Sequence, residues 1–327
     1  FILPTLRIQK KLKDYLAQFR PDLVVLIDYI GSNVKVGQLA RALGIPVAYY
    51  IAPQEWVWRT FSGDTSRIVG FTDLILAIFP EEARYYGRHG GKVQWIGHPL
   101  TDIVRATTPR TEFRARLGTP TAAPVAVLTP ASRPQELRYL MPLLFETARR
   151  LQGQVADLHC WIALSTEKFR EPIARAARDY GLRHAFIPAG ANYDALAAAD
   201  VLLTKSGTVN LEAALLDLPQ VVAYRVAPLT YAIGKLIRFK IPFASPVNLV
   251  EMREVVPEFL QERATPEALV QAALPLLTDP EAIARIREGY ACVRTSLGSS
   301  GAIDRGAEAI LDLLDRRSVL HSDPARR

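Results

Sequence analysis

The chain has 327 residues, of which 49% are hydrophobic and 22% charged, a balance that excludes a disordered or fibrous protein. This length predicts two domains, and the longest apolar runs, such as 23–27 and 74–79, are too short to cross a bilayer. Lysine and arginine exceed the acidic residues by 40 − 33 = 7, which suits a phosphorylated ligand, an anionic lipid surface or nucleic acid.

The first part of the chain predicts a parallel α/β domain, because short apolar runs alternate with amphipathic segments. We expect helices over 3–19 and 34–43 and a third that begins after Pro80. The expected strands cover 23–28, 47–51, 74–79 and 93–96. A doubly wound domain normally opens with a strand and a phosphate-binding turn. Neither precedes the first helix, so we expect a first domain that is incomplete at its N-terminus.

The second part of the chain repeats this alternation after residues 97–124, a segment rich in proline, threonine and arginine that we interpret as the interdomain connection. The expected strands cover 125–128, 158–164, 185–187, 201–203 and 221–223. Residues 266–317 are helical by pattern, and 318–327 are expected to fray. We therefore expect Rossmann-like domains over 1–105 and 106–285, with C-terminal helices over 286–327 that pack back on the first domain.

Two sequence features concern the cellular setting. Cys160 and Cys292 are far apart and form no CxxC pair, which excludes a disulfide framework or cysteine-ligated zinc and favours a reducing compartment. The chain starts at Phe1, with neither methionine nor a leader pattern, so we expect it to begin inside a longer protein.

Asp28 is the candidate general base. It ends an aliphatic strand, and the carboxyl ends of strands face the ligand crevice in open α/β sheets. A carboxylate there, beside apolar neighbours, is placed to accept a proton. The alternative is a helix N-cap, a role that Ser32 or Asn33 could fill instead.

A candidate anion site lies at residues 204–208, which follow one predicted strand and open a predicted helix. Free amides and the helix dipole attract anions at such a start, and Glu212, one turn further on, is within reach of a ribose hydroxyl. Arg133 and Arg225 follow two other strands and add cations suited to a diphosphate. The alternatives are ordinary capping and surface side chains. The absence of GxxxxGK[ST] excludes a P-loop.

A third group consists of Trp56, Trp58, Arg59 and His98. The tryptophans follow a strand end and suit an acceptor-side wall, although sheet packing is the commoner reason for such residues. His98 could face the cleft, although a lone histidine is more often a structural residue. The chain has no HExxH, DxD or clustered histidine and cysteine, so we expect no bound metal. It also lacks a G-x-S-x-G elbow and any RRM, KH or helix-turn-helix pattern, so we expect neither an α/β-hydrolase nor a nucleic-acid partner.

Seven short strings occur in order along the chain. They are Ile27-Asp28 with Asn33, Pro53-x-x-Trp56-x-Trp58-Arg59, Ile96-Gly97-His98, Pro130-x-Ser132-Arg133, Ser206-Gly207-Thr208-x-x-Leu211-Glu212, Tyr224-Arg225 and Pro246-Val247-Asn248-Leu249. Over about residues 21–310 this series resembles the lipid A disaccharide synthase family, the inverting glycosyltransferases of glycosyltransferase family 19. The resemblance implies the GT-B fold, which consists of two Rossmann-like parallel-sheet domains.

The family joins UDP-2,3-diacylglucosamine to 2,3-diacylglucosamine 1-phosphate (lipid X), giving a β-1,6-linked disaccharide and UDP. The resemblance implies that Asp28 deprotonates the acceptor hydroxyl. The implied UDP-sugar-binding residues are Arg133, Ser206, Gly207, Thr208, Glu212, Arg225 and Asn248. The implied acceptor-side residues are Asn33, Trp56, Trp58, Arg59 and His98. No cofactor is expected, because cations and a helix dipole can stabilise the leaving diphosphate without a metal.

Three features depart from the family pattern. Its N-terminal glycine-rich turn is absent, Gly31 stands where the family often has a second aspartate, and Pro134 follows Arg133 where the family has glycine. Two alternatives therefore stay open. One is another GT-B enzyme that uses a UDP-GlcNAc-type sugar, such as a peptidoglycan glycosyltransferase or an epimerase. The other is a nucleotide-sugar-binding remnant without activity.

The expected location is the inner face of the cytoplasmic membrane, with the protein held peripherally on anionic lipid. Two segments, 1–13 and 233–240, mix apolar residues with lysine and arginine, a composition suited to a headgroup layer. The alternative for 1–13 is core left uncovered by a missing N-terminal segment, and for 233–240 packing between the domains. A homodimer is a further option that the sequence leaves open.

Overall fold

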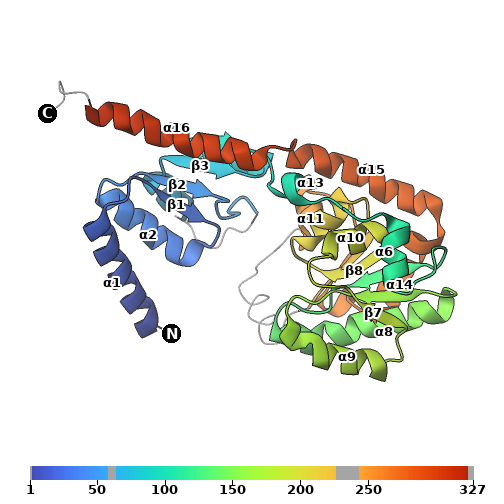
Figure 1. The fold of residues 1–327 in the computed structure, drawn as a ribbon. Helices are drawn as coiled ribbons and strands as arrows, with labels where there is room; N and C mark the ends of the chain where they lie inside the picture. The colour runs from blue at the N-terminus through green and yellow to red at the C-terminus, as the bar shows by residue number, and fades with distance from the viewer. Residues whose placement is uncertain (1, 58–63, 226–242, 323–327) are drawn as a thin grey trace. The chain divides into compact units, whose positions relative to one another are not determined.

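A computed structural model describes the backbone of residues 2–57, 64–225 and 243–322, and within these ranges the side chains from residue 10 to residue 316. The chain separates into two compact units, residues 1–102 with 296–327 (unit 1) and residues 103–295 (unit 2) (Figure 1). Each unit is built on one parallel sheet with helices packed against it. The predicted fold class, α/β with two parallel sheets, is therefore confirmed.

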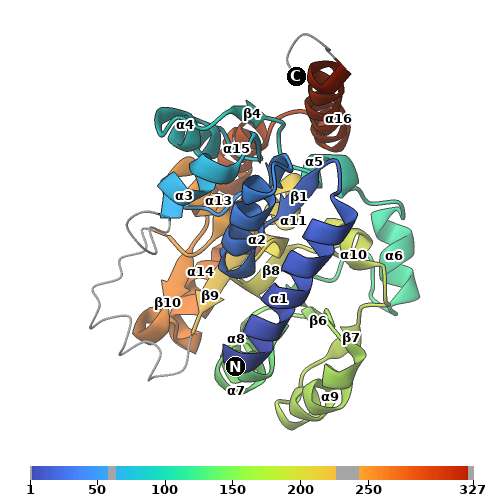
Figure 2. The ribbon, with the colours of Figure 1, turned by 90° about the vertical axis from the view of Figure 1, so that its left-hand side faces the viewer.

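Unit 1 contains a four-stranded sheet in the order β1-β2-β3-β4. The strands are β1 (Val24–Ile27), β2 (Val47–Tyr50), β3 (Leu74–Ala77) and β4 (Val93–Trp95). The helices are α1 (Ile2–Phe19), α2 (Ile30–Ala42), α3 (Asp64–Phe71), α4 (Pro80–Arg88), α5 (Leu100–Ile103) and α16 (Ala302–Ser322). Helix α1 packs beside α2 (Figure 2). The core gathers around Tyr49, Ile75 and Tyr86.

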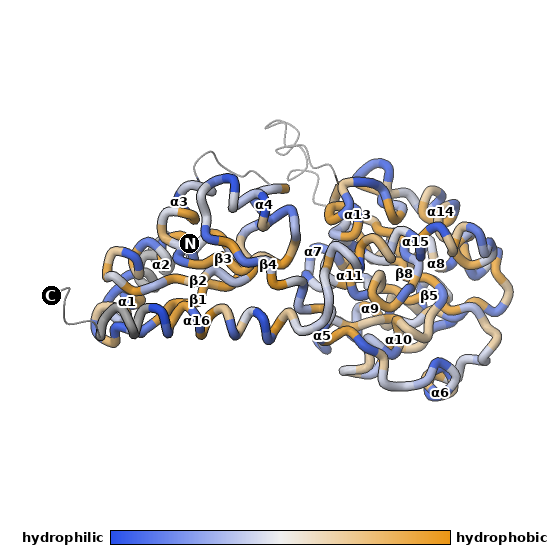
Figure 3. Tube along the Cα trace, turned by 90° about the horizontal axis from the view of Figure 1, so that it is seen from above, coloured by the Kyte–Doolittle hydropathy of each residue, from blue (hydrophilic) through white to orange (hydrophobic). Residues whose placement is uncertain are grey.

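The C-terminal helix α16 belongs to unit 1 because polar contacts tie its start there. Asp102 accepts the backbone N–H groups of Gly301 and Ile303, and Arg305 Nε donates to the carbonyl of Ile96 over 2.8 Å. Hydrophilic and hydrophobic stretches alternate along this helix (Figure 3), as expected for a helix with one face against protein and one against solvent.

Unit 2 contains a six-stranded parallel sheet in the order β10-β9-β8-β5-β6-β7. The strands are β5 (Val125–Leu128), β6 (His159–Ile162), β7 (His184–Phe186), β8 (Val201–Lys205), β9 (Gln220–Tyr224) and β10 (Glu258–Leu260). The helices up to β9 are α6 (Arg110–Arg116), α7 (Pro134–Tyr139), α8 (Met141–Gln154), α9 (Arg170–Asp179), α10 (Asn192–Ala198) and α11 (Val209–Leu215), with a 3₁₀ turn η1 (Glu167–Phe169). Those after β9 are α13 (Pro246–Glu251), η2 (Gln261–Arg263), α14 (Pro266–Thr278) and α15 (Pro280–Leu297).

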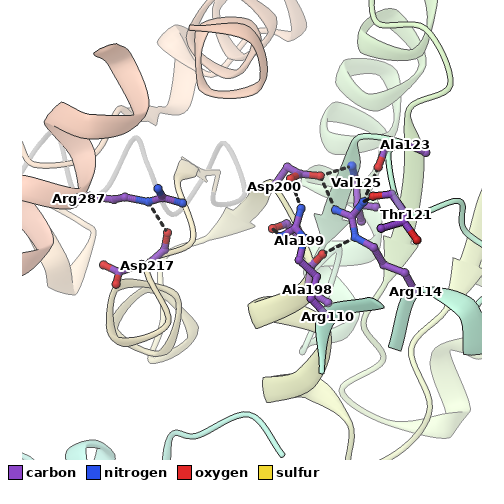
Figure 4. Close-up of polar contacts among 10 residues, drawn as sticks. All are labelled: Arg110, Arg114, Thr121, Ala123, Val125, Ala198, Ala199, Asp200, Asp217 and Arg287. Carbon is purple, nitrogen blue, oxygen red and sulfur yellow. Dashed lines mark hydrogen bonds and ion pairs between the residues drawn. The ribbon is translucent and has the colours of Figure 1, made fainter. Parts of the chain in front are cut away.

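The interpretation of residues 97–124 as a connection is wrong for most of their length, because α6 packs into the core of unit 2. Arg114 of this helix is 1% exposed, as is Phe113 beside it. The Arg114 guanidinium donates to Asp200 Oδ2 over 2.7 Å and to the carbonyl of Ala198 over 2.9 Å (Figure 4). Two further bonds reach the carbonyls of Thr121 and Ala123. A buried charge is tolerated because every part of it is paired.

Three smaller differences follow from short or uneven patterns. Strand β10 and helix α3 were not predicted, because three residues of strand and eight of helix give too little periodicity. The predicted frayed end is also partly wrong, because α16 continues to Ser322. By contrast, the predicted strand 125–128 is confirmed residue for residue, since all four of its residues are apolar and buried.

Candidate functional site

A cavity of about 290 Å³ lies at the carboxyl edge of the unit 2 sheet, where β5, β6 and β8 end and α10 and α11 begin. Its polar lining includes Thr129, Ser132, Ser165, Lys205, Thr208 and Glu212. The position matches the rule that open parallel sheets bind ligands beyond the carboxyl ends of their strands. Of the predicted UDP-sugar-binding residues, the structure brings Gly207, Thr208 and Glu212 to this cavity.

The side chain of Asn210 hydrogen-bonds the backbone of the turn at residues 205–208, which lies at the wall of the cavity. Its Oδ1 accepts the N–H of Gly207 over 2.9 Å, and its Nδ2 donates to Gln220 Oε1 over 2.9 Å and to the carbonyl of Lys205. The predicted set of free amides is therefore wrong at Gly207, whose N–H already has a partner. Ser206 does not line the cavity, and its hydroxyl donates to the carbonyl of Ala244. The hydrogen bonds of Asn210 therefore fix the backbone of this turn.

Glu212 and Lys205 bring opposite charges to the same cavity. Burial raises the pKa of the Glu212 carboxyl above its usual value. Lys205 Nζ lies 3.5 Å from Glu136 Oε1. Sequence reasoning missed Lys205 as a site residue, although it stands inside the 204–208 string. The signal was its place directly after the buried residues of β8, at the edge where ligands bind.

Arg133 and Arg225 do not line the cavity in this structure. The backbone N–H of Arg133 donates to Glu136 Oε2, and the side chain is exposed. The guanidinium of Arg225 donates to the carbonyl of Ala264, near the start of α14. The expected convergence of both arginines with the turn is therefore absent among the described residues, and their roles toward a ligand stay predictions.

Asn248 is fully buried, and both ends of its carboxamide are used by the protein. Its Oδ1 accepts the N–H groups of Val255 and Val256, and its Nδ2 donates to Glu258 Oε2 and to the carbonyl of Val256. Glu258 in turn accepts the N–H groups of Ala244 and Ser245. Asn248 therefore holds the segment that receives the Ser206 hydroxyl, which differs from the expected direct place in the cleft.

Asp28 stands at the carboxyl end of β1 with its carboxylate exposed and its backbone fixed. Its φ of 51° lies in the left-handed region, which aspartate tolerates better than most residues. The Asp28 carbonyl accepts the Tyr49 hydroxyl over 2.8 Å and Asn33 Nδ2 over 3.3 Å. Burial of Tyr49 raises the pKa of its phenol, which keeps it a donor. Hydrogen bonds therefore fix the backbone at Asp28, while its carboxylate is exposed.

Four other predicted acceptor-side residues are Trp56, Trp58, Arg59 and His98. Trp58 and Arg59 fall outside the described residues. Trp56 lies 6.1 Å from the Phe79 ring, and Phe79 lies 5.2 Å from the His98 ring, measured between centroids. Burial lowers the pKa of His98 to about 4, and its Nδ1 accepts the N–H of Leu100. His98 is therefore a neutral, largely buried side chain near neutral pH.

The described residues contain no group of three or more histidine, cysteine, aspartate or glutamate side chains arranged to hold a metal ion. Both cysteines are free thiols, and burial raises the pKa of Cys160 to about 12. No helix in the described part of the chain has the length and apolar character needed to cross a membrane.

Comparisons with known proteins agree with this architecture. A family model described as lipid-A-disaccharide synthetase matches residues 1–303. The lipid-A-disaccharide synthase of Gloeothece citriformis is 47% identical over 315 residues, which cover 95% of this chain and 82% of that protein. The enzyme of the same name from Myxococcus xanthus is 35% identical, over 94% of this chain and 80% of that protein.

Among solved structures, a UDP-GlcNAc 2-epimerase from Neisseria meningitidis bound to UDP-GlcNAc has a TM-score of 0.62 at 16% identity, covering 94% of this chain and 81% of that one. An S. aureus MnaA–UDP co-structure has a TM-score of 0.63 at 16% identity, with 95% and 81% covered. At such identities the likeness shows the fold alone. The family resemblance drawn from the seven strings is confirmed by the family model and the relatives, and the chain belongs to the lipid-A-disaccharide synthetase family.

Proposed function

We propose that this chain transfers 2,3-diacylglucosamine from its UDP conjugate to the 6-hydroxyl of 2,3-diacylglucosamine 1-phosphate, with release of UDP. Family membership supports the reaction. The single structural observation that carries the proposal is the cavity at the carboxyl edge of unit 2, which combines hydroxyls, a lysine and a glutamate at the start of α11. Such a set suits a nucleoside diphosphate.

In the proposed mechanism, each unit supplies one half of the chemistry. Asp28 of unit 1 accepts the proton of the acceptor hydroxyl as its oxygen attacks C1 of the donor sugar. The C1–O bond to the diphosphate breaks, and the configuration at C1 inverts. The exposed carboxylate on a fixed backbone supports this role. In unit 2, Lys205 and the Gly207–Thr208 turn stabilise the charge that develops on leaving UDP.

The test is turnover of the two named substrates by the purified full chain, followed by mass spectrometry of the disaccharide and by UDP release. We expect the disaccharide to appear with equimolar UDP, and to appear equally in EDTA. UDP-GlcNAc without an acceptor serves as the control for the epimerase alternative, and we expect no 2-epimer. Failure to form disaccharide in any condition, while UDP still binds, would support the non-catalytic alternative.

We include peripheral association with an anionic membrane in the proposal. The net charge of +7 and the acyl chains of both substrates support it. The segment 233–240 and the side chains of residues 1–9 lie outside the described residues. Liposome flotation should show binding that needs anionic lipid and weakens with salt. Changing Lys235, Arg238 and Lys240 to glutamate should reduce binding, while the same change at the exposed Lys168, Arg175 and Arg178 should not.

A further inference from the structure

Lys205 is the one cation among the described residues that line the cavity of unit 2. It ends β8, which pairs with β5, and the segment that follows β5 contributes Ser132 to the same cavity. Its ammonium lies 3.5 Å from Glu136 Oε1. The two side chains are only 20% and 18% exposed. Solvent and salt therefore screen this pair less than a surface pair.

The second carboxylate oxygen of Glu136, Oε2, accepts hydrogen bonds that fix the side chain in this position. This oxygen accepts the N–H of Ser132 over 2.5 Å and the N–H of Arg133 over 3.2 Å, and the Ser132 hydroxyl lies at 3.2 Å. Reaching back to the start of its own helix is ordinary capping. Capping accounts for Oε2 only. The other oxygen, Oε1, faces the lysine of the cavity, which capping does not require.

We propose that Lys205 binds the diphosphate of the UDP-sugar and that Glu136 is the counter-ion that Lys205 leaves when the ligand arrives. The inference rests on the proposed function of this cavity. In the unliganded protein, a largely buried lysine without a counter-ion would reduce the stability of the fold. The ion pair with Glu136 offsets that loss. The same carboxylate competes with the incoming diphosphate for the Lys205 ammonium, because both anions pair with that one charge. Glu136 therefore lowers the affinity for UDP, which favours release of this product.

The pair predicts opposite effects from its two members. Lys205→Met should weaken UDP binding by about 10- to 100-fold, the range for loss of one charged hydrogen bond. Glu136→Gln keeps an oxygen for the capping N–H groups but removes the charge. It should tighten UDP binding by about 2- to 5-fold, the range for a modest ion pair. In the double variant the gain from Glu136→Gln should disappear, because its partner is gone.

Isothermal titration calorimetry of the full chain with UDP and with uridine tests these effects. Uridine lacks the diphosphate, so its affinity should be the same in all variants. Lys168→Met, an exposed lysine of the same unit beside Phe169, is the matched control and should bind UDP as the wild type does. Lys205→Arg keeps the charge and should keep most of the affinity. Melting temperatures identify any variant that fails to fold.

The inference is overturned if the wild type binds UDP while Lys205→Met binds it equally well. It is also overturned if Glu136→Gln weakens binding at an unchanged melting temperature, or tightens binding equally with and without Lys205. A wild type that binds no UDP at all would instead remove the proposed function. The two failures are therefore distinguishable in the first titration.

Discussion

The strands of the two sheets have similar aliphatic sequences, but their side chains are buried to different extents. In β8 of unit 2, Val201, Leu202 and Leu203 are all 0% exposed, because strands lie on both sides and helices cover the faces. In β1 of unit 1, Val25 is 39% and Ile27 is 58% exposed, whereas Leu26 between them is 4% exposed, because β1 is the edge of its sheet and only the face that carries Leu26 packs into the core. The run of residues is the same in kind, so position in the sheet decides the burial.

The carboxyl edges of the two sheets also differ in how their polar groups are held. In unit 2 the carboxyl ends of three strands enclose a cavity, and its polar groups are held by buried partners such as Asn210. In unit 1 only the backbone of Asp28 is held, and its carboxylate is exposed. We infer that unit 2 is organised for binding and unit 1 for reaction. The following substitutions separate the two roles.

The largest effect should follow from Asp28→Asn. Turnover should fall by roughly 10²–10⁴-fold, the typical contribution of a general base. UDP affinity and melting temperature should stay unchanged, because the side chain is exposed and belongs to the other unit. Asp22→Asn, an exposed aspartate just before β1, is the control. A variant of Asp28 that turns over normally, or one that unfolds, would remove the assignment.

Arg133→Ala tests how far the binding role of unit 2 extends beyond the cavity wall. If its exposed side chain folds onto the diphosphate of bound ligand, UDP binding should weaken by about 1.5–3 kcal/mol. The measurement is calorimetry in EDTA, with the exposed Arg138→Ala as control. Unchanged affinity would show that the described cavity binds UDP without Arg133. The UDP-binding role that the resemblance implies for Arg133 would then be wrong.

A matched pair of valines tests the difference in burial directly. Val221→Ala in the inner strand β9 should cost about 2 kcal/mol of unfolding free energy, because it removes two fully buried methyl groups and leaves a cavity. Val25→Ala at the exposed edge should cost less than about 0.5 kcal/mol. Urea unfolding of both variants gives the two values. Equal losses would contradict the description of β1 as an uncovered edge.

The last prediction concerns the pH dependence of unit 1. Glu82 is 0% exposed, and burial raises its pKa from 4.5 to about 8, despite N–H donors from Ile78 and Phe79. The folded state therefore holds this proton more tightly than the unfolded chain. The contribution of this proton to stability should be full below pH 4.5 and should be lost progressively as pH rises through 8, so the melting temperature should fall across this range.

Glu82→Gln should remove that slope between pH 4.5 and 8. Glu81→Gln, one residue earlier and half exposed beside Arg84, should leave it in place. Thermal scans across this pH range, at constant ionic strength, compare the two variants. A slope that survives Glu82→Gln would assign the pH dependence to another group.

Local patterns in the sequence determined a large part of this protein. Four buried apolar residues predicted β5, Pro80 with two following glutamates predicted the start of α4, and an aliphatic run that ends in aspartate predicted the place of Asp28. These features depend on backbone geometry and on neighbours within a few residues, which a sequence displays directly.

Only the tertiary structure decided which of these residues meet. In the folded chain, Arg114 is buried against Asp200, and the Asn248 carboxamide is fully hydrogen-bonded within the protein. Lys205 at the end of β8 pairs with Glu136 of α7. The tertiary structure also left β1 at an edge. These side-chain contacts join partners 7 to 86 residues apart in the chain, and the order of strands in a sheet brings the distant ones together without a local signature.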